Sequence, residues 1–173
     1  MKIHDTAVLL IAALSAASAL ASPEFTEATI YTEPHNAAAA YLGTLHFMVG
    51  RMGRDCVGPL SGAESFPRDL VARWEGRNVE YYRASKVYLG NLFPYYERTR
   101  GKEFGTAAMN EYLRSVQGQG AATAEGMLAA PDRKAACAAF VARVGAGDYD
   151  IKESRPYFKE LTELVEIRRA FQK

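Results

Sequence analysis

Apolar residues recur at helical spacing through most of the chain, and the first such stripe follows a run of alanines. Asn36 is a good helix N-cap, and residues 37–40 are four alanines, which favour helix strongly. The apolar positions that follow are Tyr41, Leu45, Met48 and Met52, with Cys56 nearly in line. This pattern predicts a helix that begins at Asn36 and ends near Gly53 or Cys56, before a loop rich in Gly, Pro and Ser.

A second, longer stripe begins after Pro67 and passes through the segment WEGRNVEYYRA at residues 74–84. Its spacing is regular over more than six turns, which predicts one long helix with Pro67 in its first turn. Its members are Leu70, Val71, Trp74, Asn78, Tyr81, Ser85, Tyr88, Leu89 and Leu92. Pro94 is expected to end or kink this helix, so residues 95–105 continue it or connect it to the next.

Three further helices complete the prediction. Phe104 to Val116 indicates a short third helix that the QGQG sequence at 117–120 stops. Asp132 opens a fourth helix after Pro131, and glycines 145 and 147 end it; a fifth runs from Pro156 to about Ala170. No segment alternates as a strand does. The chain is therefore predicted to be all-α, an irregular bundle of about five helices.

The N-terminal residues have the features of a secretory signal peptide. Lys2 precedes an Ala-rich apolar run, and Ala19 and Ala21 are the small residues that a signal peptidase reads. A membrane anchor would need about 20 consecutive apolar residues, whereas Ser15 and Ser18 interrupt this run. We expect cleavage after Ala21 and a periplasmic or secreted protein.

Removal of residues 1–21 would leave an extended N-terminal lead, 22–35, and a single helical domain, 36–173. No transmembrane segment is expected in this mature chain. The net charge of +1 gives no reason to expect nucleic acid as a partner. Charge is unevenly distributed, however, because residues 67–102 hold eight Lys and Arg against four Asp and Glu.

The two cysteines, Cys56 and Cys137, both lie in the part of the chain that export would deliver to an oxidising compartment. An isolated pair in that setting is most simply a disulfide, and both residues fall on apolar stripes. The alternative is two separate buried thiols. A catalytic thiol is disfavoured because there is no Cys-x-x-Cys pair and few histidines are present to act as a base.

Catalytic and metal-binding motifs are missing from the sequence. Two histidines remain after export: His35 in the expected lead, and His46 off the apolar face of the first helix, where an ordinary surface role is expected. The chain has no metal-ligand spacing, no phosphate loop, and no calcium loop in GDYDIKE at 147–153. We therefore expect no enzyme activity, no cofactor and no metal.

The segment WEGRNVEYYRA separates into roles on a helical wheel. Trp74 and Tyr81 belong to the buried stripe, and Asn78 lies within it, where a buried amide needs partners. Arg77 lies at the edge of the stripe, where its stem can pack and its guanidinium can reach an oxygen atom.

Tyr82 and Arg83 fall on the flank of the same helix. Tyrosine and arginine are enriched at protein contacts, so this flank is a candidate binding surface. The alternative is an ordinary solvated face.

The leading functional hypothesis is a non-enzymatic exported protein that binds another protein of the cell envelope, of the inhibitor or immunity type; this analogy rests on size and compartment alone. The first alternative is a carrier or sensor that binds a small or lipidic ligand between helices, with methionines 48, 52, 109 and 127 as lining. The second is an envelope hydrolase. The sequence names no ligand, partner or oligomeric state.

Overall fold

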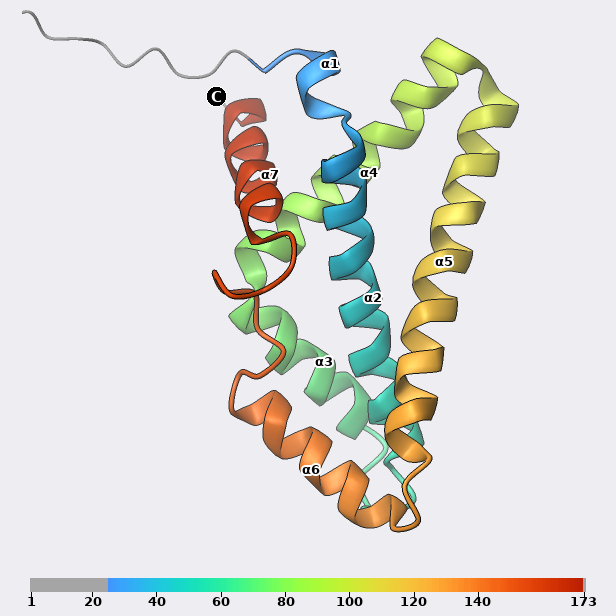
Figure 1. Cartoon of the computed structure of the whole chain (residues 1–173), viewed down its shortest axis with the longest axis vertical. Coiled ribbons are helices and arrows are strands. Elements are labelled where there is room, and N and C mark those ends of the chain that lie inside the picture. The colour runs from blue at the N-terminus through green and yellow to red at the C-terminus, as the bar shows by residue number, and fades with distance from the viewer. Residues whose placement is uncertain (1–24, 173) are drawn as a thin grey trace, which may run out of the picture.

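The computed structural model describes residues 25–172, all of them helix or connecting loop, as Figure 1 shows. The helices of this part of the chain are α1 (Glu27–Ile30), α2 (Glu33–Asp55), α3 (Phe66–Arg77), α4 (Val79–Arg100), α5 (Lys102–Leu128), α6 (Arg133–Gly145) and α7 (Phe158–Phe171). The predicted all-α, irregular bundle is confirmed. The expected signal peptide, residues 1–21, lies outside the described residues.

Helix α2 is the centre of the bundle and contacts α5, α3, α7 and α4. Its apolar face supplies Leu42, Val49 and Met52, each at most 1 % exposed. Tyr41 and Leu45, expected on this face, lie at its edge and are half-buried. The rest of the core comes mainly from Trp74, Tyr88, Leu161, Leu164 and Ile167.

The N-terminal lead is not wholly extended. Within residues 25–35, α1 forms a single turn, and α2 begins at Glu33 rather than at Asn36. The Thr32 hydroxyl caps α2 by accepting from the His35 amide at 3.4 Å, and Pro34 fits the first turn, where its missing N–H is not needed. His35 is therefore a buried helical residue and not part of a lead.

The expected single long helix is broken at Asn78. This residue has φ −107° and ψ 20°, outside the helical region, so the chain forms α3 and α4, which meet at a sharp bend in Figure 1. Pro94, in contrast, lies inside α4, which continues to Arg100 and ends at Gly101 with φ 96°. Of the two alternatives for residues 95–100, helix continuation is the one observed.

The expected stop at residues 117–120 does not occur, because α5 continues to Leu128. Gly120 faces α2, and a Cβ built there would lie 2.8 Å from Cδ1 of Phe47 and 3.1 Å from the carbonyl oxygen of Thr44. A glycine at this position lets the two helices approach closely. The packing of α5 on α2 outweighs the low helix propensity of glycine, so the helix is not interrupted.

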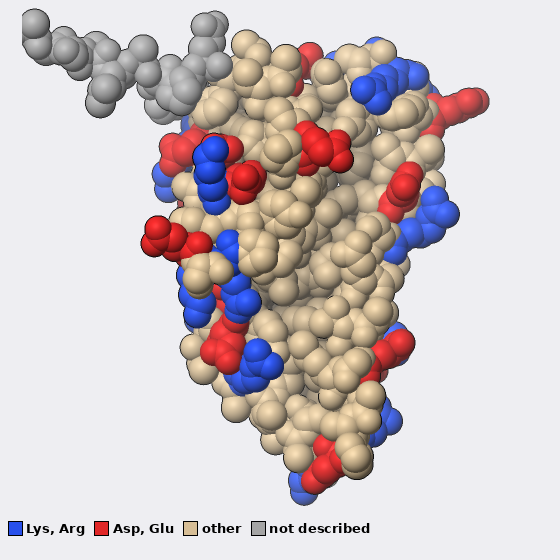
Figure 2. Space-filling model, viewed as in Figure 1, with Lys and Arg blue, Asp and Glu red and all other residues tan. Residues whose placement is uncertain are grey.

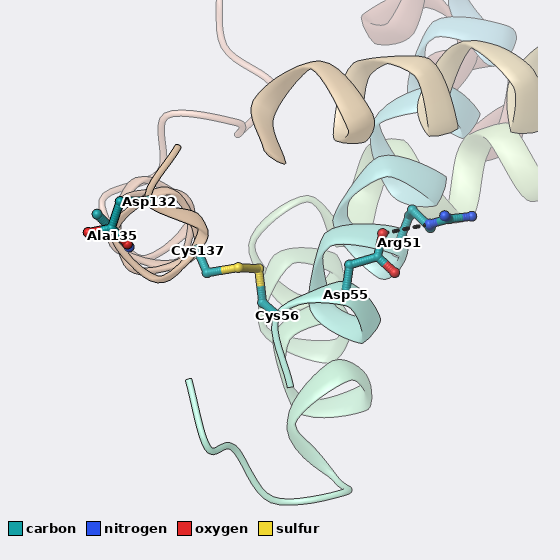
Figure 3. The surroundings of a disulfide bond; sticks show 6 residues. All are labelled: Arg51, Asp55, Cys56, Asp132, Ala135 and Cys137. Atoms are coloured by element: carbon teal, nitrogen blue, oxygen red, sulfur yellow. Dashed lines mark hydrogen bonds and ion pairs between the residues drawn. A yellow bond between two sulfur atoms is a disulfide. The ribbon is translucent and has the colours of Figure 1, made fainter. Parts of the chain in front are cut away.

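The predicted disulfide between Cys56 and Cys137 is present and ties the C-terminal end of α2 to α6 (Figure 3). The Cα atoms are 5.5 Å apart, both cysteines are fully buried, and 81 positions separate them in sequence. The predicted start of α6 is also correct, since the Asp132 carboxylate accepts from the Ala135 amide at 2.9 Å.

Charged side chains are unevenly distributed over the surface. On the face in Figure 2 they gather along its edges, over α7 on the left and along the outer side of α5 on the right, and the middle is largely uncharged. Within residues 25–172, no helix combines the length and the apolar character that crossing a membrane requires.

Candidate functional site

Two of the residues singled out in WEGRNVEYYRA bind the loop between α6 and α7. The indole nitrogen of Trp74 donates to the carbonyl oxygen of Tyr149 at 2.9 Å. The Arg77 guanidinium pairs with the Asp150 carboxylate at 2.8 Å and donates to the Val144 carbonyl. These contacts join the end of α3 to a segment about 70 residues further along the chain.

Asn78 completes this junction. It is 1 % exposed, and its Oδ1 accepts from the Ile151 amide at 2.7 Å. Its Nδ2 donates to the Trp74 carbonyl at 2.8 Å and to the Asp150 carboxylate at 3.3 Å. Every polar atom of the side chain therefore has a protein partner, and the amide stabilises the bend between α3 and α4.

Tyr81, Tyr82 and Arg83 diverge from one another at the start of α4. Tyr81 packs against Phe158 of α7, with ring centroids 6.1 Å apart. Tyr82 and Arg83 lie on another side of the helix, where both line a surface hollow. Residues 74, 77, 78 and 81 thus have structural contacts, whereas Tyr82 and Arg83 form an accessible pair.

The accessible pair belongs to a series of three hollows, here called the α3–α4 groove. The first, about 380 Å³, lies between α2 and α3; the second, about 340 Å³, follows the junction of α3 and α4; the third, about 240 Å³, lies between α2, α4 and α5. The first two share Ala72 and Glu75, and the last two share Tyr82 and Lys86. The shared residues place the three hollows next to one another along one surface.

One side of α2 supplies residues to the first and third hollows. Gly43, His46 and Phe47 line the third, and Gly50 and Arg54 line the first. These positions follow the three- and four-residue spacing of one helical face. The groove is therefore assembled from α2, α3, α4 and α5, and the bend at Asn78 decides how its two arms meet.

Positive charge predominates along the groove. Its lining includes Arg54, Arg68, Arg83 and Lys86 but only one carboxylate, that of Glu75. Among the described residues, no ion pair joins Arg54, Arg83 or Lys86 to a carboxylate, and Arg68 has only a long 3.9 Å pair with Asp69. Three of the eight Lys and Arg noted in residues 67–102 thus lie on this surface.

Glu75 is already occupied by its neighbours. Nε2 of His46 lies 2.7 Å from its carboxylate. Burial, and then the charge and hydrogen-bonding of Glu75, raise the pKa of Tyr82, whose ring lies 5.0 Å from that of His46. The Nζ atom of Lys86 lies over the Tyr82 ring, 5.6 Å from its centroid. The four side chains form an ordered rim between the second and third hollows.

Sequence reasoning missed both histidines. His46, expected to be an ordinary surface residue, is part of the groove rim. His35 is buried, with Nδ1 2.7 Å from the Ile30 carbonyl and Nε2 3.1 Å from the Glu163 carboxylate. Their carboxylate partners lie 29 and 128 positions away, so no local pattern in the sequence points to either contact.

The methionines proposed as the lining of a ligand cavity do not line these hollows. Met48 and Met52 are at most 2 % exposed in the core, Met127 packs on the core, and Met109 is 39 % exposed. In residues 25–172, no cluster of three or more His, Cys, Asp and Glu side chains is arranged to hold a metal ion.

Comparisons with protein-family models, with curated proteins and with solved structures find no match to this chain.

Proposed function

We propose that this is an exported, non-catalytic protein that binds another protein of the cell envelope through the α3–α4 groove. The observation that carries the proposal is an ordered, accessible surface whose cations have few partners within the chain. Arginine and aromatic side chains are enriched at contacts between proteins.

The division of roles within residues 74–83 supports this choice of surface. Trp74, Arg77 and Asn78 are engaged by the loop between α6 and α7. Tyr82 and Arg83 make no contact with that loop. Tyr82 lines both the second and the third hollow, and Arg83 lines the second. The Tyr and Arg content of this segment thus has a structural explanation for some members and leaves the others for binding.

The disulfide supports export. A bridge between two fully buried cysteines is stable in an oxidising compartment and rare in a reducing one. Together with the signal-peptide pattern at the N-terminus, it favours a periplasmic or secreted location, where a small bundle of this kind acts as an inhibitor or immunity-type protein.

Site-specific photo-crosslinking in the producing cell tests the proposal. A photoreactive amino acid replaces Arg83 on the groove or, as a matched control, Lys134, which is exposed on α6. The expected result is one discrete protein adduct from position 83 that is absent from position 134. A competing excess of unlabelled wild-type protein should abolish it.

Two results would overturn the proposal. One is the absence of a protein adduct at position 83 in cells where the protein is exported and oxidised. The other is the same set of adducts from both positions, which would mean random collision rather than a binding surface.

A further inference from the structure

We infer that the partner presents to the α3–α4 groove an extended polypeptide segment with several acidic side chains and one large apolar side chain. This inference rests on the proposed function and names the chemistry of the partner. In it, the carboxylates pair with the groove cations, and the apolar side chain enters the hollow between α2, α4 and α5.

The charges of the groove favour a ligand with more than one anionic group. Arg54 comes from α2, Arg68 from α3, and Arg83 and Lys86 from α4, so the cations lie around different hollows. The lining holds one carboxylate, that of Glu75, against these four cations. Complementary charge at such a surface steers association and selects the partner.

The dimensions of the groove favour an elongated ligand. Pockets for small molecules usually measure about 300–1,000 Å³; each hollow here is near or below the lower end of that range, and the three lie one after another along the surface. From Arg68 to Gly76 the α3 arm rises about 12 Å, and from Val79 to Lys86 the α4 arm rises about 10 Å. An extended segment of about seven residues follows both arms.

The third hollow provides an anchoring site at one end. Its lining is largely apolar and includes Leu42, Phe47, Leu89, Leu113 and Val116. Lys86 and His46 stand at its rim, so a charged side chain and an apolar side chain of one ligand can be bound next to each other. A buried anchor beside a polar rim is the usual arrangement of an energetically dominant contact.

Other anionic partners fit these features less well. A lipid headgroup carries its charge at one point and would leave the cations of the opposite arm without partners. A membrane surface is flat and cannot enter a concave groove. Nucleic acid is usually bound by a larger basic surface, whereas this chain carries a net charge of only +1.

Selection from a phage-displayed library of random 12-residue peptides against the oxidised protein tests this inference. The expected peptides carry at least three Asp or Glu within about seven residues and a Phe, Leu or Trp at one end of that run. Their binding, measured by fluorescence anisotropy with the synthetic peptides, should weaken as salt rises.

Matched variants assign the binding to the groove. Arg83→Glu with Lys86→Glu should weaken binding about tenfold or more, whereas Lys134→Glu with Lys152→Glu, at two exposed positions elsewhere, should leave it within about twofold. Gln117→Trp should obstruct the third hollow and weaken binding without changing its salt dependence. Circular dichroism verifies that each variant is folded.

Several outcomes would overturn the inference. These are a selection that enriches no acidic peptides, equal effects of the two double charge reversals, and tighter binding of phosphatidylglycerol vesicles, palmitate or a 12-nucleotide single strand than of the selected peptides. A last experiment repeats the crosslinking with the photoreactive residue in place of Tyr82, in the protein that carries Arg83→Glu and Lys86→Glu. If the adduct still forms, the protein binds a partner protein but the inference of an acidic partner is refuted.

Discussion

Replacing Asn78 by alanine removes a side chain that makes three hydrogen bonds, two of which join the end of α3 to the loop after α6 and one of which goes to the Trp74 carbonyl. The loss of the acceptor matters most, because the Ile151 amide is buried and gives its hydrogen bond to Asn78. A buried N–H without an acceptor costs about 1–3 kcal/mol. The bonds from Nδ2 add about 1 kcal/mol, so we expect a total loss of about 3 kcal/mol in the free energy of unfolding.

The chain carries its own probe for this measurement. Trp74 is the single tryptophan, is 0 % exposed and precedes Asn78 by one helical turn. Its fluorescence and far-ultraviolet circular dichroism should report the same urea transition if unfolding is two-state. A loss of about 3 kcal/mol moves the urea midpoint down by roughly 1–2 M.

Asn91→Ala is the matched control. The Asn91 amide also donates to the carbonyl four residues earlier, at 2.8 Å, but it is exposed on α4 and makes no long-range contact. Its replacement should change the free energy of unfolding by at most about 0.5 kcal/mol. If Asn78→Ala costs no more than Asn91→Ala, the amide does not support the loop and the argument is refuted.

Three further predictions use the same urea assay. Gly120→Ala should destabilise by about 1–3 kcal/mol because the added methyl meets α2, whereas Gly118→Ala, with open space around it, should stabilise by up to about 1 kcal/mol; equal effects would contradict the close approach. Burial raises the pKa of Tyr112 to about 12 from 10.0, so the phenol favours the folded state below pH 10 and this contribution is lost as pH rises toward 12. Tyr112→Phe should therefore make stability fall less steeply with pH, by up to about 1.4 kcal/mol per pH unit, and an unchanged slope would exclude this account. Replacing both Cys56 and Cys137 by alanine should cost about 4 kcal/mol by loop entropy, and a cost below about 1 kcal/mol would show that the bridge adds little.

Two kinds of feature could be predicted from the sequence: those that depend on a local pattern of residues, and the disulfide, which depends on the presence of only two cysteines. The helical spacing of apolar residues correctly identified the buried faces around Met52 and Trp74. A helix that buries one face needs apolar residues at every third or fourth position, so the pattern is visible in the sequence. Two cysteines on apolar stripes identified the bridge. The N-cap of α6 followed from the position of Asp132 before an apolar pattern.

The break at Asn78 could not be predicted in this way. Trp74 and Tyr81 keep helical spacing across it, so periodicity reads one helix through the bend. The break is stabilised by Asp150 and Ile151, which lie more than 70 positions away. A tertiary contact of this range leaves no mark on the local pattern.

The length of α5 and the composition of the groove were missed for the same physical reason. Glycine weakens an isolated helix, but Gly120 lies where α2 leaves no room for a side chain, so packing reverses the local preference. Arg83 was noted as a candidate contact residue, yet its place in one hollow with Glu75 depends on how α3 and α4 meet. Sequence alone identified the residue types at the surface and not their grouping.

The disulfide has a consequence for a protein exposed to proteases. Helices α3, α4 and α5 all lie between Cys56 and Cys137, so the bridge encloses the whole of both arms of the groove in one covalent ring. A single cut within that ring, for example in the loop before α3, opens the ring but leaves the two fragments attached to each other. The nicked protein keeps its full mass until a reductant is added, and the packed helices hold the groove together in the meantime.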